Sequence, residues 1–296
     1  MGITEKLISE TTFELLKDAA TRLPPAVERR LRAAYRTESH PAAKAQLKTI
    51  LDNIEMARRG CLLICQDTGL PLFFVQLGLR AAVKCDIERA LRDATLKASR
   101  AVPYRPNVIH PLTKENPGTN VGWGMPHVYY AVDPKADWLE ITAFPKGFGA
   151  EAKSSLAYVT TDKPITEAVI KCVLDEVCLA MGEPCPPTIV GVGLGGTADV
   201  AMTLAKRALV RQPLGGHHPD PSVKALERRL LETVNRTGIG PMAMGGDTTA
   251  LAVHVEICGS HTAGVPVAIN LQCWAARHST ARIYRDGRVE YLTHPR

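Results

Sequence analysis

The stretch that decides the fold is TIVGVGLGGTADVAMTLAKRALV, residues 188–210. It begins with a short apolar run, passes through four glycines, and continues with alanine- and leucine-rich sequence of helical periodicity. This order predicts a buried strand over 188–192 that turns at the glycines into a helix over 197–210. A strand followed closely by a helix is typical of mixed α/β domains.

The sequence on both sides of this unit continues the same mixture of helices and strands. Apolar residues at helical spacing predict helices over 3–22, 25–37, 42–59, 86–102, 166–181 and 221–236. Alternating or continuous short apolar runs predict strands over 70–79, 127–133, 138–144, 249–257, 265–271, 280–284 and 288–292. We therefore expect a mixed α/β fold in one domain of residues 1–296. In it, a helical N-terminal region, 1–60, precedes mixed sheets with flanking helices in 61–296.

Composition and charge exclude several classes of protein. The chain is 45% hydrophobic and 22% charged, which is ordinary for a globular protein. No apolar stretch is long enough to span a membrane, and the first residues have no secretory pattern, so we expect a cytoplasmic protein. The net charge of +6 is mild, and the basic run 28–36 contains a single aromatic residue, Tyr35, rather than a series of stacking platforms. We therefore expect neither a membrane nor a nucleic-acid partner.

The glycine run matches G-x-G-x-x-G at Gly191, Gly193 and Gly196, between the expected strand and helix. A nicotinamide-dependent oxidoreductase uses this pattern to bind a dinucleotide, and it is one hypothesis for the function. The acidic residue that should end the next strand is Asp220, which instead lies in a turn. A simpler interpretation is that N–H groups at the helix N-terminus bind an anion such as a carboxylate.

Eight cysteines are present, and no two are spaced as C-x-x-C, which argues against a zinc ribbon. Cys61, Cys172 and Cys178 lie in helical or apolar segments, and we expect them to be core thiols. We also expect Cys85 and Cys258 to be structural.

Three other cysteines, Cys65, Cys185 and Cys273, stand in turn-like settings. Cys65 opens the run CQDTG, and Cys185 is flanked by prolines that fix the direction of its thiol. Cubane iron–sulfur clusters usually take four cysteines. With three, one iron keeps an open position and can act as a Lewis acid on a substrate. These thiols are therefore candidate cluster ligands.

Six ordered stretches together resemble the class I (iron–sulfur) fumarases. The stretches are 65–69, 116–120, 146–149, 185–187 together with 190–198, 238–241 and 261–277. The resemblance is closest to the α subunit of the two-subunit form and to the related L(+)-tartrate dehydratase α subunit. It covers nearly the whole chain and implies the fold of the class I fumarase N-terminal domain.

The resemblance implies a set of site residues. In that family the positions of Cys65, Cys185 and Cys273 ligate a [4Fe–4S] cluster. The positions that line the substrate site are those of Gln66, Asp67, Arg105, Gly149 and His261. Asp67 is the candidate catalytic acid, because it stands beside a cluster ligand and the leaving hydroxide needs a proton.

The resemblance also implies the reaction and the partners. The reaction is the reversible addition of water to fumarate, which gives (S)-malate, with the open cluster iron as Lewis acid. A separate β subunit supplies the carbon base, and the expected assembly is α2β2. The alternative is a tartrate dehydratase α subunit, which converts tartrate to oxaloacetate.

Two departures from the fumarase pattern leave the substrate open. Ala150-Glu151-Ala152 follows the glycine turn where fumarases commonly carry Ser-Glu-Asn or Ser-Ala-Asn. Residues 242–246 read MAMGG where many relatives carry Gly-Leu-Gly-Gly. Both changes could retune the choice among fumarate, tartrate and a methylated analogue. The runs 195–197 and 261–264 favour fumarate.

Overall fold

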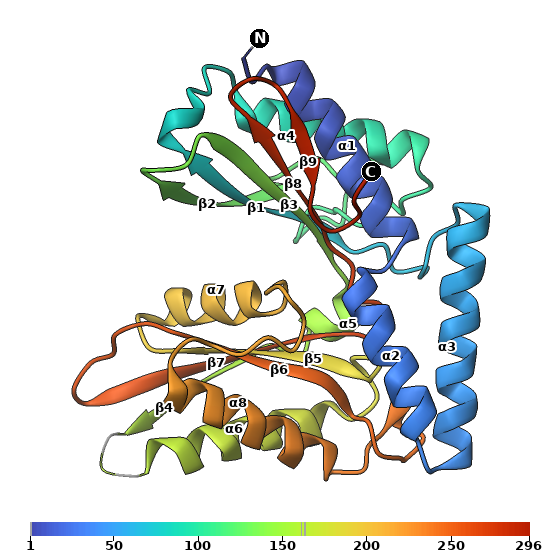
Figure 1. Ribbon diagram of the computed structural model, residues 1–296, viewed down its shortest axis with the longest axis vertical. Coiled ribbons are helices and arrows are strands. Elements are labelled where there is room, and N and C mark those ends of the chain that lie inside the picture. Colours follow the sequence, from blue (N-terminus) through green and yellow to red (C-terminus); the bar gives the residue numbers. More distant parts are fainter. Residues whose placement is uncertain (1, 161, 163) are drawn as a thin grey trace. The chain divides into compact units, whose positions relative to one another are not determined.

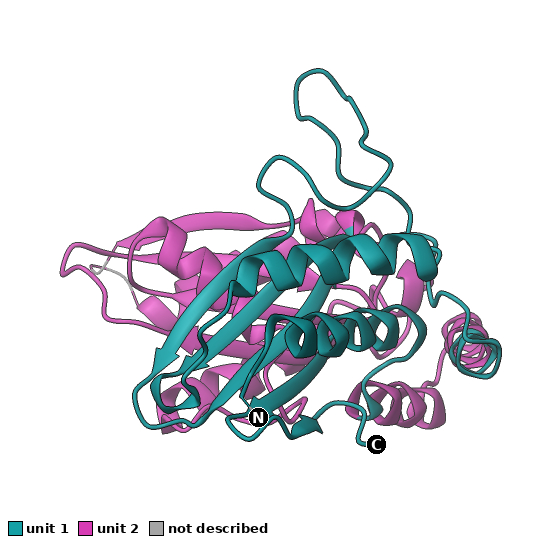
Figure 2. Cartoon of the chain, turned by 90° about the horizontal axis from the view of Figure 1, so that it is seen from above, with its two compact units in different colours: residues 1–25, 53–147, 277–296 teal, residues 26–52, 148–276 magenta. Residues whose placement is uncertain are grey.

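The structure, a computed structural model, describes residues 2–160, 162 and 164–296. The chain divides into two compact units (Figure 2). Unit 1 consists of residues 1–25, 53–147 and 277–296, and unit 2 consists of residues 26–52 and 148–276. The helices expected in residues 1–60 are confirmed, and they divide between the two units. The assignment of the whole chain to one domain stays a prediction.

Unit 1 contains a five-stranded sheet with the order β2-β1-β3-β8-β9 (Figure 1). The strands are β1 (Leu70–Gly78), β2 (His127–Asp133), β3 (Trp138–Lys146), β8 (Ser279–Tyr284) and β9 (Val289–Tyr291). Strand β1 is parallel to β2, and the remaining pairs are antiparallel. The sheet is therefore mixed, as expected.

Two helices, α1 (Glu5–Thr21) and α4 (Ile87–Ala101), cover one face of this sheet (Figure 1). Thr4 and Asp86 cap their N-termini by accepting backbone N–H bonds from Leu7 and Arg89. The shared core includes the fully buried Leu15, Leu91, Phe73, Leu139 and Ile283. Burying each such side chain stabilises the unit by about 1.5–3 kcal/mol. The 3-10 turn η1 (Leu79–Ala81) follows β1.

Unit 2 is built on a four-stranded sheet with the order β4-β7-β5-β6. The strands are β4 (Ser155–Thr160), β5 (Thr188–Leu194), β6 (Ala250–Ile257) and β7 (Gly264–Gln272). Strand β5 pairs with β6 in parallel and with β7 antiparallel. Helix α7 (Ala198–Ala208) lies on one face, and α6 (Ile165–Ala180) and α8 (Pro221–Asn235) lie on the other (Figure 1).

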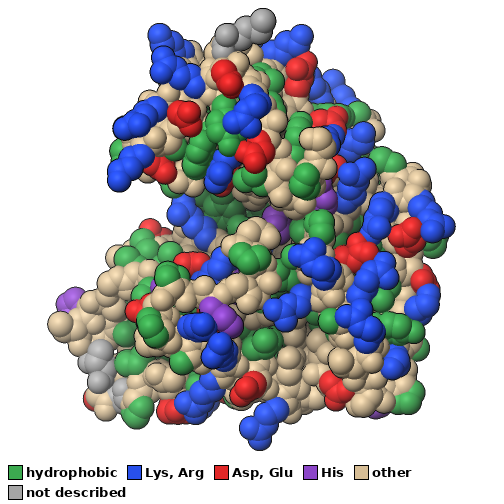
Figure 3. All heavy atoms as spheres, in the orientation of Figure 1, with side chains coloured by type: hydrophobic (Ala, Val, Ile, Leu, Met, Phe, Trp, Pro, Cys, Tyr) green, Lys and Arg blue, Asp and Glu red, His purple; other side chains and the backbone are tan. Residues whose placement is uncertain are grey.

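Further helical segments complete the chain. They are α2 (Pro25–Thr37), α3 (Pro41–Gly60), the short α5 (Phe148–Glu151) and the 3-10 turn η2 (Pro241–Ala243). Among the helices of the described residues, none is long and apolar enough to cross a membrane. On the face drawn in Figure 3, lysine and arginine side chains are interspersed with acidic and apolar ones, in keeping with the mild net charge.

The glycines of the β5–α7 unit allow a helix to pack unusually close to a strand. A Cβ on Gly191 would collide with the carbonyl oxygen of Ala205, and one on Gly193 would collide with that of Ala201. Asp220 caps α8, where it accepts the N–H bonds of Ser222 and Val223. These contacts explain why glycine stands at positions 191 and 193 and aspartate at position 220. A bound dinucleotide is not needed to explain these three residues.

Three local expectations were wrong. Strand β4 was not expected, and the glycine turn after β3 leads directly into the helix Phe148–Glu151. Cys61 and Cys178 are exposed, so they are not core thiols. Periodicity identifies a helix but does not say which of its faces is buried.

Candidate functional site

In unit 1, three expected site residues lie immediately before β1. Cys65 is half-buried, Gln66 is exposed and Asp67 is half-buried. The Oδ1 atom of Asp67 accepts a hydrogen bond from the N–H of Gly69 at 3.0 Å, which fixes the plane of the carboxylate. Gly69 has φ +78°, and a Cβ there would press on the backbone of β3, so glycine is required at this turn.

The loop that contains Arg105 is hydrogen-bonded to the same turn. The backbone N–H of Arg105 donates to Oγ1 of the buried Thr68 at 3.1 Å. The side-chain amide of Asn107 donates to Thr68 Oγ1 and to the carbonyl of Gly69, both at 3.2 Å. The Arg105 side chain itself is exposed. The structure therefore places the backbone of Arg105 beside the turn that contains Asp67, two residues after Cys65.

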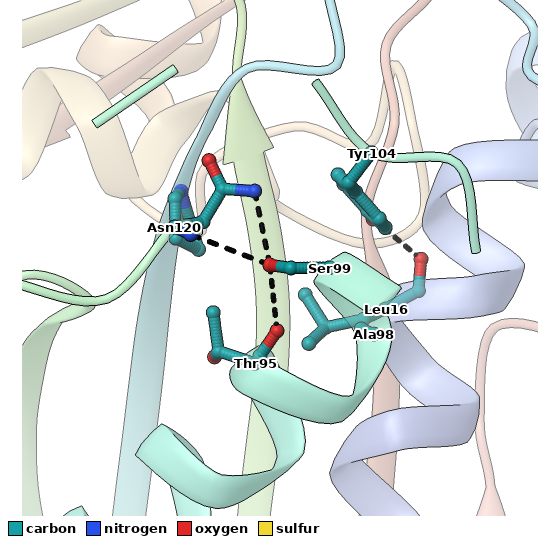
Figure 4. A pocket seen from close by; sticks show the side chains of 7 residues that line it. Leu16, Thr95, Ala98, Ser99, Tyr104 and Asn120 are labelled. Atoms are coloured by element: carbon teal, nitrogen blue, oxygen red, sulfur yellow. Dashed lines mark hydrogen bonds between the residues drawn. The ribbon is translucent and has the colours of Figure 1, made fainter. Parts of the chain in front are cut away.

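Arg105 lies in the loop between α4 and β2, residues 102–126. This loop is anchored at Tyr104 and at Asn120, which both line a small pocket beside α4 (Figure 4). The hydroxyl of Tyr104 donates to the carbonyl of Leu16 at 2.7 Å. At the other end, the side-chain amide of Asn120 donates to Ser99 Oγ at 3.1 Å, and Ser99 in turn donates to the carbonyl of Thr95. Because its ends are held, the loop presents Arg105 in a defined place.

In unit 2, the backbones at Cys185 and Cys273 are neighbours. The N–H of Trp274 donates to the carbonyl of Cys185 at 3.1 Å. Cys185 precedes β5 with a left-handed φ of +53°, between Pro184 and Pro186, and Cys273 follows the end of β7. Both cysteines are half-buried. Two of the three candidate ligands therefore lie at one end of the unit 2 sheet.

Gly149 belongs to the same end of unit 2. A Cβ on Gly149 would lie 2.9 Å from the carbonyl oxygen of Glu183, two residues before Cys185. Lys153 and Glu183 form an ion pair at 2.8 Å that also connects these two segments. Close packing against Glu183 therefore explains why glycine stands at position 149, whether or not its N–H contacts a ligand.

A buried polar network holds the helix that follows Gly149. Lys206 of α7 is 8% exposed and pairs with Glu151. Glu151 also accepts a hydrogen bond at 3.0 Å from the fully buried amide of Asn270, which contacts Ser154 as well. Replacing one member of the network leaves its polar partner without an ion pair or a hydrogen bond. The network therefore stabilises one particular position of α5.

His261 lies at the opposite end of the unit 2 sheet. It precedes β7 on an exposed turn, where its Nδ1 accepts from the N–H of Ala263. The register pairs Ile189 with Gln272 near the two cysteines and Leu194 with Val267 near His261. At about 3.3 Å per residue, these two pairs are about 17 Å apart. Within unit 2, His261 is therefore not brought to the Cys185–Cys273 end, and its role stays a prediction.

The N-terminus of α7 already has a carboxylate of its own. Thr197 Oγ1 donates to Asp199 in the first helical turn, and this bond lowers the pKa of Asp199. The expected anion site at this helix N-terminus therefore competes with a resident acidic side chain. Over residues 2–160, 162 and 164–296, no group of three or more His, Cys, Asp or Glu side chains is placed to hold a metal ion. Convergence of the three thiols stays a prediction.

Comparison with known families identifies the class of protein. The sequence model of the fumarate hydratase (Fumerase) family matches residues 9–282. The chain belongs to this family, which is a family of hydro-lyases. The resemblance and the mixed α/β fold expected from the sequence are thus confirmed.

Two similar proteins are named as tartrate dehydratase α subunits. A provisionally named L(+)-tartrate dehydratase subunit alpha of Methanocaldococcus jannaschii is 44% identical over 285 residues, which cover 95% of this chain and 99% of that protein. The L(+)-tartrate dehydratase subunit alpha of Escherichia coli strain UTI89 is 32% identical over 277 residues, covering 94% and 91% of the two chains.

Proposed function

We propose that this chain is the α subunit of an iron–sulfur hydro-lyase that catalyses the reversible hydration of fumarate to (S)-malate. The observation that carries the proposal is that one turn of unit 1 holds the Asp67 carboxylate through Gly69 and binds the Arg105 backbone through Thr68. Membership of the fumarate hydratase family supports the same chemistry.

The donor set fits an iron–sulfur cluster. Cys65, Cys185 and Cys273 are all of intermediate exposure, and a thiolate is the usual ligand of an iron–sulfur cluster. We propose that these three residues hold a [4Fe–4S] cluster. When bound, it supplies a Lewis-acidic iron for the substrate's hydroxyl and carboxylate.

The side chains around Asp67 suit a dicarboxylate. The exposed guanidinium of Arg105 can bind one substrate carboxylate through two parallel hydrogen bonds. The exposed amide of Gln66 offers a further donor in the same unit. In unit 2, we propose that the N–H of Gly149 binds substrate. The Asp67 carboxyl transfers the proton to the departing hydroxyl in dehydration and takes it back in hydration. We propose that His261 also contacts substrate.

Dehydration of tartrate to oxaloacetate is a second candidate, because the similar proteins cited above are named tartrate dehydratase subunits. Tartrate carries one more hydroxyl than malate, so its site needs an additional hydrogen-bonding partner. A site built for that hydroxyl rejects a substrate that lacks it. The two candidates therefore differ in a ratio of kcat/KM values that one assay can measure.

The names of the relatives as α subunits support a second type of chain as partner. We propose that a β subunit supplies the base that removes the carbon-bound proton and that the assembly is α2β2, in the cytoplasm. Accordingly, this chain alone should be inactive.

The test is a kinetic assay under anaerobic conditions. The chain, reconstituted with iron and sulfide, is assayed alone and with a candidate β chain on fumarate, (S)-malate and L(+)-tartrate. The proposal expects activity only in the pair, with kcat/KM highest for fumarate and malate. Preference for tartrate would replace the first candidate by the second, and absence of both activities in a pair that contains the cluster would refute the proposal.

A matched pair of variants localises the chemistry. Asp67→Asn should lower kcat by about 100-fold or more, because it removes an acid–base group. Asp93→Asn, which changes an exposed aspartate on α4 of the same unit, should leave kcat unchanged.

A further inference from the structure

Arg277 is the bulkiest fully buried side chain among the described residues. It belongs to unit 1 and is 1% exposed. Its Nε–H is enclosed and has no hydrogen-bond partner among the described residues. A buried cation is costly unless an opposite charge lies near it, so its neighbours indicate why an arginine stands here.

The topology of the unit 1 sheet brings Arg277 close to Asp67. Strand β3 is antiparallel to both β1 and β8, with Leu70 opposite Lys146 and Ala143 opposite Ser279. The residues just before β1, just after β3 and just before β8 therefore meet at one end of the sheet. Asp67, Gly147 and Arg277 occupy these three places.

Gly147 lies next to both Asp67 and Arg277, so the position of its missing Cβ shows how near each charged group is. The position that a Cβ on Gly147 would occupy is 3.0 Å from Asp67 Oδ2 and 3.4 Å from Arg277 Nη2. Oδ1 of Asp67 accepts from the N–H of Gly69, and Oδ2 is the oxygen that, like Arg277 Nη2, lies beside the Gly147 position. Any side chain at position 147 would press into the space that these groups share.

An electrostatic interaction indicates that Arg277 also lies near the start of the Arg105 loop. Burial raises the pKa of the Tyr104 hydroxyl, and the positive charge of Arg277 acts in the opposite direction. Tyr104 anchors the start of that loop through its bond to Leu16. Arg277 therefore lies among the segments that present Asp67 and Arg105.

We propose that Arg277 is a positioning residue for Asp67. Its positive charge attracts the carboxylate and holds the Oδ2 atom in place. Since its side chain is enclosed, it acts through Asp67 and makes no contact with substrate. Gly147 lacks a side chain so that the two groups can approach. The consequence for catalysis rests on the proposed function, whereas the interaction itself can be tested without activity.

The first test is a double-variant cycle on the chain without cofactor. The melting temperature is measured for wild type, Asp67→Asn, Arg277→Met and the double variant. The proposal expects the double variant to melt at least about 3 °C above the value that adds the two single shifts. Additive shifts would overturn it.

The control cycle pairs Asp67→Asn with Arg282→Met. Arg282 lies on β8 of the same unit and has its own carboxylate partner, Glu140, at 2.8 Å. This cycle should be additive. If it is as non-additive as the Arg277 cycle, the effect is not specific to Arg277 and the proposal fails.

The second test is kinetic and uses the loaded enzyme with its partner. Arg277→Lys, which keeps the charge, should retain clearly more kcat than Arg277→Met, while KM changes less than about threefold in both. Arg277→Met should cause no further loss in the Asp67→Asn background. A rise in KM at constant kcat, or no advantage of lysine, contradicts the proposal.

Gly147→Ala covers the case in which Arg277→Met does not fold. Its added methyl group enters between Asp67 and Arg277, so kcat should fall about tenfold or more with KM little changed. An unchanged kcat would overturn the proposal. If the wild-type pair shows no hydro-lyase activity, the proposed function fails, and the melting cycle alone decides the positioning role.

Discussion

Two buried histidines should make unit 1 unstable at mildly acidic pH. His278 is 3% exposed and His294 is 9% exposed. Burial, reinforced by the nearby His294, lowers the pKa of His278 from 6.5 to about 4. Burial and the positive charges of Arg22, Arg296 and Arg58 lower the pKa of His294 to about 4 as well.

The sign and size of the effect follow from the pKa values. Between pH 6.5 and about 4 the unfolded chain binds protons at these histidines and the folded chain does not. Stability is therefore complete above pH 6.5 and is lost as the pH falls toward 4. Each pKa unit corresponds to about 1.4 kcal/mol, so each histidine costs the folded state about 3 kcal/mol at most. The two are coupled, so their combined cost is smaller than twice this value.

The measurement is urea unfolding followed by tryptophan fluorescence from pH 7 to 4.5. The wild type should lose at least about 2 kcal/mol more stability over this range than the double variant His278→Gln/His294→Gln, which cannot titrate there. His40→Gln, at an exposed position of unit 2, is the control and should behave as wild type. Equal pH dependence in wild type and double variant, or NMR titration of both folded histidines near pH 6.5, would refute the reasoning.

Two substitutions test the packing of unit 2. Gly191→Ala should lower the free energy of unfolding by about 1–3 kcal/mol or more, because the added methyl group meets the backbone of α7. The control, Gly259→Ala, places its methyl group in open space and should change the free energy of unfolding little. Similar urea midpoints for the two variants would contradict this packing. Lys206→Met should cost about 1.5–3 kcal/mol, because the partly exposed Glu151 loses its buried cationic partner. Lys171→Met removes only an exposed ion pair and should change stability little. Equal melting temperatures for these two variants would show that the buried network contributes nothing.

The strand–helix units could be predicted where local sequence alone decides them. The apolar run before Gly191 and the helix after Gly196 have the expected order, and Asp86 caps its helix as predicted. Strand β4 could not be predicted in the same way. It is a short strand at the edge of its sheet, partly polar, and it pairs residue by residue with β7, with Ser155 opposite Ile269. Its conformation depends on a partner distant in sequence.

The candidate site likewise combines features that local sequence predicts with features that depend on strand pairing. The turn that holds Asp67 and the proline-flanked Cys185 have local signals in the sequence. The approach of Arg277 to Asp67 has none, because it arises only when β3 pairs with both β1 and β8. Burial of an arginine cannot be read from residue type, since arginine is usually exposed. The separation of His261 from the two cysteines of unit 2 likewise follows from strand register.

The measurement that tests the central claim most directly is the iron and sulfide content after anaerobic reconstitution. Wild type is compared with Cys65→Ser, Cys185→Ser and Cys273→Ser, and with Cys178→Ser, an exposed cysteine on α6, as control. We predict about four irons per chain in wild type and in the control, and loss of most of this iron in each of the other three variants. Full iron loading of the Cys185→Ser variant would contradict the account.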